Sequence, residues 1–173
     1  MFKVIVLLSS IALLSGVYAS RTSAQTSVTA TATAQVIAAL TAIETSQMNF
    51  GRFSPETQGG QILLTPDGVL TTQGTVLMGG GTHSSASFYI TGESNATFSI
   101  ILPSAPALLT NTVSSKTMQV TGWQSIPSPG VGVGKLTGGS VTIQVGAALN
   151  VGTMDANPVG IYTGSYAITF TYN

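Results

Sequence analysis

The chain has 173 residues, with five Lys and Arg against five Asp and Glu, so that only 6% of it is charged while 43% is hydrophobic. Five scattered cations cannot follow a phosphate backbone, which excludes nucleic-acid binding. Without cysteine there is no disulfide, thiolate nucleophile or Cys-ligated zinc, and a single histidine leaves little for a metal site. We therefore expect one domain that is not an enzyme, with no catalytic residue, cofactor or metal.

The first residues predict export. Lys3 precedes an apolar run over residues 4–14, and small residues follow up to Ala19, which is the order of a secretory signal peptide. We predict a signal peptide over residues 1–19, with cleavage after Ala24 as the alternative. A membrane anchor is the competing interpretation, but the run is shorter than the roughly 20 residues that cross a bilayer. The mature chain is then expected not to insert into a membrane.

Residues 28–40 alternate between apolar side chains and Thr or Gln, as in a half-buried strand. This pattern predicts an extended arm over residues 20–40, followed by a domain over residues 41–173. Ile37 and Leu40 belong either to the arm or to the first strand of the domain. The apolar side of the arm consists of Val28, Ala30, Ala32, Ala34 and Val36.

Short candidate strands punctuated by turns fill the rest of the chain. Pro66-Asp67-Gly68 predicts the turn of a hairpin, because Pro fixes φ and Gly accepts positive φ. Residues 127–139 look like a flexible connection. This spacing is typical of an all-β antiparallel sandwich. The expected strands are 48–53, 61–65, 69–72, 75–78, 86–91, 97–102, 116–123, 140–149 and 161–172.

Three features could carry chemistry. The run from Gly130 to Lys135 lacks the first Gly and the final hydroxyl of a phosphate-binding loop, so we interpret it as a turn. His83 lies among small polar residues without an activated serine nearby, which indicates a solvated loop. Trp123 either stacks on a sugar or packs in the core, and its strand pattern favours the core.

The C-terminal residues form the most regular pattern of the chain. Apolar side chains and glycines occupy the even positions from residue 160 to residue 172, and mostly small or polar ones occupy the odd positions. This alternation predicts one long strand over residues 161–172. The residues on its apolar side are Gly160, Tyr162, Gly164, Tyr166, Ile168, Phe170 and Tyr172.

This ending resembles the subunits of chaperone–usher fimbriae, whose last strand alternates and carries a penultimate Tyr and a Gly fourteen residues from the end, here Tyr172 and Gly160. The resemblance implies an immunoglobulin-like sandwich that lacks a strand, with the apolar side of residues 160–172 bordering the gap. In that family a periplasmic chaperone fills the gap first, and the N-terminal arm of the next subunit replaces it at the outer-membrane usher. The chain departs from many fimbrial subunits in lacking paired cysteines.

A second resemblance covers nearly the whole mature chain. The Asn49-Phe50-Gly51 step and the ending from Gly160 to Tyr166 are similar to a bacterial secreted family, domain of unknown function 4402. Its members often look fimbrial. The two resemblances imply a structural subunit of a surface fibre of a Gram-negative bacterium, which would pass through the periplasm and pair with copies of itself or with related subunits.

Two other functions remain open at this point. The first is a secreted or tip-located adhesin with a complete sandwich, whose loops around His83, Trp123 and residues 127–134 hold a ligand. The second, a hydrolase, requires converging polar groups that the sequence does not supply. Whether the arm is donated to a neighbour or kept by its own domain also stays open.

Overall fold

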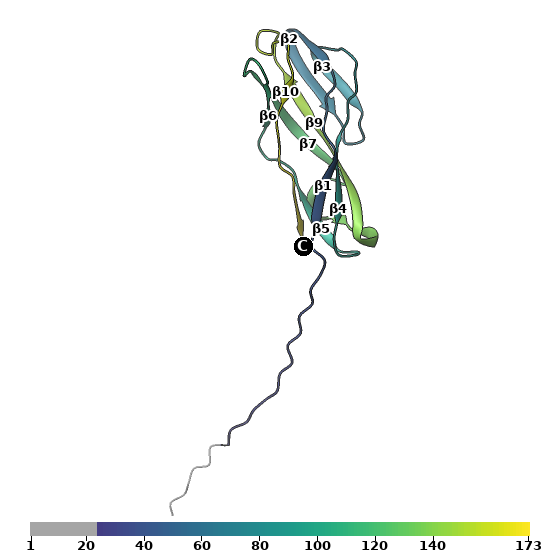
Figure 1. The fold of residues 1–173 in the computed structure, drawn as a ribbon, viewed down its shortest axis with the longest axis vertical. Coiled ribbons are helices and arrows are strands. Elements are labelled where there is room, and N and C mark those ends of the chain that lie inside the picture. Colours follow the sequence, from purple (N-terminus) through teal and green to yellow (C-terminus); the bar gives the residue numbers. More distant parts are fainter. Residues whose placement is uncertain (1–23) are drawn as a thin grey trace, which may run out of the picture. The chain divides into compact units, whose positions relative to one another are not determined.

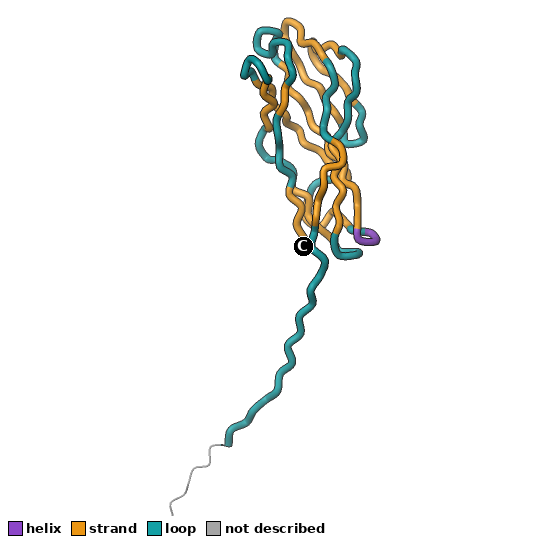
Figure 2. Tube along the Cα trace, in the orientation of Figure 1, coloured by secondary structure: helices purple, strands orange, loops and turns teal. Residues whose placement is uncertain are grey.

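The computed structural model describes residues 24–173, and the predicted signal peptide over residues 1–19 lies outside them. Residues 36–173 form one compact unit. Its strands are β1 (Thr41–Ser46), β2 (Phe53–Leu64), β3 (Leu70–Met78), β4 (Ala86–Thr91), β5 (Thr97–Ile101), β6 (Ala107–Asn111), β7 (Thr117–Ile126), β8 (Gly130–Lys135), β9 (Ser140–Val151), β10 (Tyr162–Thr163) and β11 (Thr169–Tyr172), with one 3-10 turn at Thr137–Gly139. Figure 2 shows that the unit consists of strands and loops apart from one short helical turn.

All strand pairs are antiparallel, and they form two sheets. The larger sheet has the order β1-β4-β9-β7-β6-β10, and β2 joins it by pairing with β3 and with β9. The smaller sheet has the order β11-β5-β8. β9 is the central strand because it pairs with β4 along its first half, with β2 along its second half and with β7 on its other side (Figure 1). The expected all-β sandwich-like fold is confirmed.

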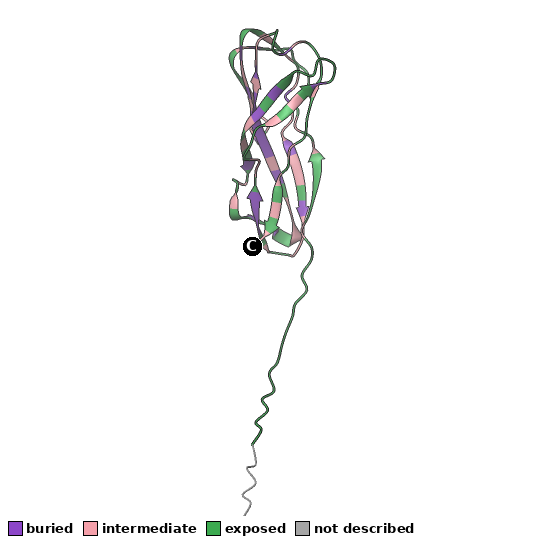
Figure 3. Cartoon of the chain, turned by 90° about the vertical axis from the view of Figure 1, so that its left-hand side faces the viewer, coloured by how far each residue is buried: buried purple, intermediate pink, exposed green. Residues whose placement is uncertain are grey.

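Two clusters of buried side chains hold the unit together. The first, which we call the upper cluster, lies around Ile62, Leu64 and Leu149. The lower cluster lies between the two sheets, with Ile90 and Ile143 from the larger sheet and Phe98 and Ile100 from the smaller one. Met48 and Trp123 pack against both clusters and therefore join them. Figure 3 shows the buried residues along the strands of this unit.

The predicted hairpin is confirmed. The amide of Gly68, whose φ is +85°, donates to the carbonyl of Thr65, and Leu64 pairs with Leu70 across the turn. The expected strands at residues 86–91, 97–102, 116–123 and 140–149 correspond to β4, β5, β7 and β9. Short apolar segments bounded by turn residues therefore located these four strands.

Several boundaries differ from the sequence prediction. Residues 75–78 do not form a separate strand, because Gly74, with a φ of +78°, continues β3 through a register shift. Of residues 48–53, only Asn49 forms an isolated bridge, to Ser84, and β2 begins at Phe53. Residues 127–139 contain β8, which pairs with β5 because Gly134 lets the ring of Phe98 lie against its backbone.

The prediction of one strand over residues 161–172 is wrong. The segment forms β10, which pairs with β6 in the larger sheet, and β11, which pairs with β5 in the smaller one. Residues 164–168 cross between the sheets without strand pairing. The predicted alternation nevertheless holds, because the even residues of this segment apart from Gly164 are half-buried and the odd ones are exposed.

The N-terminal arm also differs from a half-buried strand. Residues 24–39 are exposed and contain no strand, and the first strand begins at Thr41, opposite Thr91. Leu40 already packs against the lower cluster, so it belongs to the compact unit. No helix within residues 24–173 has the length and apolar character needed to cross a bilayer.

Candidate functional site

Two edge strands, one from each sheet, approach each other near their ends. β1 pairs with β4, and β11 pairs with β5; neither has a second partner among the described residues. Tyr172 of β11 nevertheless hydrogen bonds to Ala38, which shortly precedes β1. We call this side, between β1 and residues 164–172, the open seam. The free edges of β1 and β11 present backbone donors and acceptors that can pair with an added strand.

Large apolar side chains line the open seam, and they are only half-buried. The ring of Phe88 on β4 lies 6.0 Å from that of Phe170 on β11, measured between centroids, so the two sheets meet here through aromatic contact. Covering the remaining apolar surface of such side chains is favourable by roughly 25 cal/mol per Å². We call its lining the half-buried side chains from the C-terminal segment, from β4 and from Leu40 that pack against the lower cluster, namely Leu40, Phe88, Tyr166, Ile168, Phe170 and Tyr172.

Two buried polar atoms next to the seam have no hydrogen-bond partner among residues 24–173. They are Nε1 of Trp123 and the hydroxyl of Tyr166. The two rings stack on each other with centroids 4.6 Å apart. A buried polar group without a partner costs about 1–3 kcal/mol, so native structures contain few of them. Both atoms lie where the C-terminal segment crosses between the sheets, since Tyr166 belongs to the unpaired residues 164–168 and stacks on Trp123.

Burial raises the pKa of Tyr166 to about 12, and the negative charge of Glu44 on β1 contributes in the same direction. Glu44 pairs with Phe88 across the strands, so its side chain lies on the same face of the sheet as the aromatic lining. The neutral hydroxyl of Tyr166 is therefore the form that the folded domain favours at physiological pH.

The raised pKa predicts a loss of stability in alkali. The folded-state pKa lies above the ordinary value of about 10. The free energy of unfolding therefore keeps its full contribution from neutral Tyr166 below pH 10 and loses it as the pH rises through 12. Tyr166→Phe should remove this loss and, because it removes an unpartnered hydroxyl, should cost no stability at pH 8. Urea unfolding of both proteins at pH 8, 10 and 11 measures the difference. Parallel pH profiles would contradict the assignment.

A small hydrogen-bonded cluster closes one end of the seam. Tyr172 donates its hydroxyl to the carbonyl of Ala38 at 3.0 Å and accepts the amide of Glu93 at 2.6 Å. The carboxylate of Glu93 in turn accepts the amide of Ala38 at 3.0 Å. Gly92 leaves room for the Tyr172 hydroxyl, where a Cβ would collide with it. We call these residues the clasp. Both backbone polar groups of Ala38 are fixed by it.

The structure divides the predicted acceptor residues into two groups. Tyr166, Ile168, Phe170 and Tyr172 pack against the lower cluster and line the open seam. Gly160, Tyr162 and Gly164 lie against β6 instead. A side chain at Gly160 would collide with Asn111, one at Gly164 would collide with the carbonyl of Leu108, and the Tyr162 hydroxyl donates to Pro158 at 2.8 Å. These three therefore fasten the C-terminal segment to the larger sheet.

The predicted donor residues are exposed and unpaired. Val28 is 85% exposed and Val36 is 96% exposed, and the alanines at positions 30, 32 and 34 are exposed as well. Their alternation with Thr29, Thr31 and Thr33 is unused within the compact unit. An apolar side presented by an extended, unpaired segment is suited to pairing with another sheet edge.

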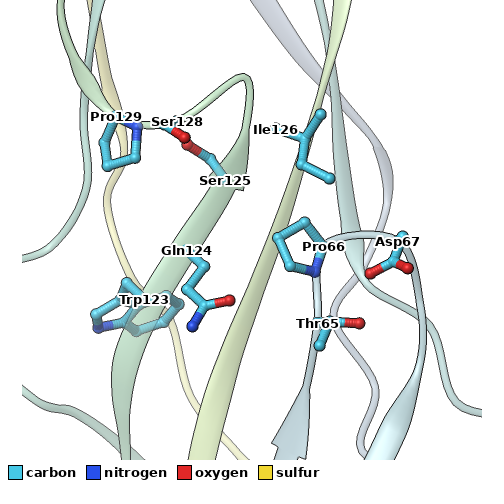
Figure 4. Close-up of a pocket in the computed structure, with 9 residues that line it drawn as sticks. All are labelled: Thr65, Pro66, Asp67, Trp123, Gln124, Ser125, Ile126, Ser128 and Pro129. Atoms are coloured by element: carbon cyan, nitrogen blue, oxygen red, sulfur yellow. The ribbon is translucent and has the colours of Figure 1, made fainter.

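A cavity of about 390 Å³ lies beside Trp123, between the turn at Thr65–Asp67 and the loop at Ser128–Pro129. Figure 4 shows Pro66 and Ile126 on one side of it and Trp123 with Gln124 on the other. The structure thus brings Trp123 close to residues 127–134, as the adhesin interpretation expects, but His83 is exposed on the loop between β3 and β4 and does not line the cavity. Tyr166 already stacks on Trp123.

No group of three or more His, Asp or Glu side chains within residues 24–173 is placed to hold a metal ion. The run from Gly130 to Lys135 forms β8, an edge strand of the smaller sheet, where we had expected a turn.

Sequence reasoning missed Phe88, Glu44 and the Glu93 part of the clasp. Phe88 had a usable signal, because Ala86, Phe88 and Ile90 alternate with polar or exposed neighbours, and all three face the core. Glu44 and Glu93 had none, because their roles depend on contacts with residues far away in the chain.

The sequence model of a family described as a domain of unknown function, DUF4402, matches residues 40–172. This range begins at Leu40, the first of the described residues that packs against the core, and ends at Tyr172, the last residue of β11. The chain belongs to the DUF4402 family. A search of curated proteins finds no significant match. The DUF4402 match thus contains both edges of the open seam, whereas the arm before residue 40 lies outside it.

Proposed function

We propose that this DUF4402 protein is a structural subunit of a bacterial surface fibre, assembled when the arm of one copy adds a strand to the open seam of another. The observation that carries the proposal is the seam itself, with two unpaired strand edges and a half-buried aromatic lining between them. Strand addition to an exposed sheet edge is an established mode of recognition. It would also remove the aggregation hazard of the free edges.

The arm of a second copy is the occupant that fits best. Residues 26–39 are exposed and contain no strand, and one side of residues 28–36 is apolar. The clasp fixes Ala38 immediately before β1, and Ala38, Ala39 and Leu40 include no Gly, Asn or Pro for the tight turn that would fold the arm back beside β1. Since this segment does not favour such a turn, the arm of a second copy is the donor that we propose.

The proposal includes the route and the partners that the resemblance to chaperone–usher subunits implies. The chain would be exported through the periplasm, where an immunoglobulin-like chaperone would cover the seam, and an outer-membrane usher would exchange the chaperone for the arm of the next subunit. The product would be a fimbrium on the cell surface. A chain with a free aromatic seam requires such protection, because exposed edges and apolar surface promote aggregation.

The test uses the mature chain with Ala30→Asp, Ala32→Asp and Ala34→Asp, which we call the arm-blocked variant, and a synthetic peptide of residues 26–40. The peptide should raise the melting temperature of this variant in a concentration-dependent way. At a hundred times its Kd the gain is about 2.7 kcal/mol, which corresponds to roughly 5–10 °C for a chain of this size.

Two control peptides distinguish strand pairing from nonspecific apolar binding. The peptide with the same three Ala→Asp changes should have no effect, because its charges would face the aromatic lining. The matched peptide with Thr29→Asp, Thr31→Asp and Thr33→Asp carries the same charge on the opposite side and should still raise the melting temperature. If the native peptide produces no rise at any concentration, the arm is not the donor strand.

An adhesin that binds a ligand in the cavity beside Trp123 is the second candidate. The cavity and its hydroxyl and amide lining support it. Its aromatic surface is reduced, however, because Tyr166 stacks on Trp123. This candidate predicts that the arm-blocked variant ignores the peptide and that Gln124→Ala abolishes attachment to the ligand-bearing surface without a change in melting temperature.

A further inference from the structure

The apolar side of the arm is made of small side chains. Its central positions are Ala30, Ala32 and Ala34, and only the flanking Val28 and Val36 are larger. A buried methyl group contributes on the order of 0.8 kcal/mol, against about 1.5–3 kcal/mol for a whole Val or Leu side chain. If the donor strand had to fill a hollow core, alanine at its central positions would therefore contribute little burial free energy.

The open seam, in contrast, is filled by large rings from both sheets. Phe88 from the larger sheet and Phe170 from the smaller one lie 6.0 Å apart, and Phe170 also packs edge-on against the fully buried Phe98 at 6.1 Å. Further along the seam, Trp123 and Tyr166 stack at 4.6 Å. Sheets of a sandwich lie about 10 Å apart. Rings in contact from both sides thus occupy most of the space between them.

β1 contributes no large side chain opposite the lining. Ala42 pairs with the buried Ile90, and Glu44 pairs with Phe88, and both Ala42 and Glu44 are exposed. The surface that an added strand beside β1 would cover is therefore formed by the aromatic rings, and its inward side chains would lie on top of them. Leucine at such a position would overpack the seam, which typically costs about 1–3 kcal/mol.

We propose that the open seam selects its strand by side-chain size, and that the aromatic rings of Phe88, Tyr166 and Phe170 restrict the inward positions of the incoming strand to alanine. This inference rests on the proposed function. The occupant is then the arm of a second copy of this chain, whose alanines match the filled seam, and a strand with Leu, Ile or Phe at the same positions is excluded.

Whether leucine in place of alanine weakens or tightens peptide binding tests the inference. Three peptides of residues 26–40, carrying Ala30→Leu, Ala32→Leu or Ala34→Leu, are titrated against the arm-blocked variant by calorimetry. In a hollow seam each leucine would bury additional apolar surface and tighten binding. In a filled seam at least two of the three should raise the Kd tenfold or more relative to the native peptide. Peptides with Thr29→Leu, Thr31→Leu or Thr33→Leu are the matched controls and should stay within about threefold.

A change in the seam should reverse the effect. Phe170→Ala, and separately Phe88→Ala, in the arm-blocked variant removes one ring and makes room for a larger side chain. At least one of these variants should bind one leucine peptide more tightly than it binds the native peptide. Circular dichroism and the fluorescence of the single Trp123 verify that each variant is folded, and the second variant provides the test if the first does not fold.

The outcomes distinguish the two levels of the proposal. Weaker binding of the inward leucine peptides, with rescue by a ring deletion, supports size selection. Equal or tighter binding of these peptides overturns size selection and leaves strand addition standing. Absence of binding by the native peptide overturns strand addition by the arm, and with it the inference.

Discussion

A second copy of residues 26–40, placed after Asn173 through a short flexible linker in the arm-blocked variant, is expected to raise the melting temperature by roughly 10–15 °C. The inward side of this strand buries three Ala and two Val, on the order of 5–8 kcal/mol, and its backbone hydrogen bonds and this burial together must exceed the cost of ordering the strand. The expected shift corresponds to a net gain of about 4 kcal/mol, at roughly 2–4 °C per kcal/mol. The linker makes the reaction intramolecular, with an effective concentration in the millimolar range.

The position of the fusion also tests the strand direction. β11 ends at Tyr172, so a strand that follows it through a short linker must run antiparallel to β11. The fused protein should be monomeric by size-exclusion chromatography and should no longer bind the free peptide. The matched control carries Ala30→Asp, Ala32→Asp and Ala34→Asp in the fused strand as well, and should melt like the arm-blocked variant. A stabilised fusion that still binds peptide would show that the added strand occupies another edge.

Phe98→Ala is expected to lower the free energy of unfolding by about 3–5 kcal/mol, which is the usual cost of deleting a fully buried phenylalanine. Phe98 is 0% exposed at the centre of the lower cluster. Its ring lies against the backbone of Gly134 on one side and against the ring of Phe170 on the other. The substitution should therefore also weaken peptide binding, because Phe170 loses its support.

Urea unfolding followed by the fluorescence of Trp123 measures this loss. Leu108→Ala on β6 is the matched control, since Leu108 is 50% exposed and its truncation should cost less than about 1 kcal/mol. A loss below 1 kcal/mol for Phe98→Ala would mean that the smaller sheet is not held to the larger one through this ring. If Phe98→Ala keeps the full affinity for the peptide, packing in the lower cluster does not determine strand binding at the seam.

The strands that the sequence predicts well are those with an unambiguous local signal. The hairpin turn at Pro66-Asp67-Gly68 and the alternation in residues 86–91 and 140–149 depend only on neighbouring residues. β8 was missed because its glycines indicate a turn, whereas they form a strand when an aromatic ring lies against Gly134.

The C-terminal segment shows why the site was harder to predict than the fold. Alternating burial looks the same whether residues 162–172 form one strand or two strands in different sheets, because the side-chain period is the same in both. The residues of this segment that face the core could therefore be predicted, but the strands with which the segment pairs could not. The clasp was out of reach for a related reason, because it joins Ala38, Glu93 and Tyr172 through contacts of high sequence separation.

The clasp has a mechanical consequence. In a fibre of the proposed kind, tension along the arm enters the compact unit through residues 36–40 and meets Ala38, which hydrogen bonds to both Glu93 and Tyr172. The pull would then be divided between the loop after β4 in the larger sheet and β11 in the smaller one. Both sheets would bear the load in parallel, and β1 would be protected from separating from β4 one hydrogen bond at a time.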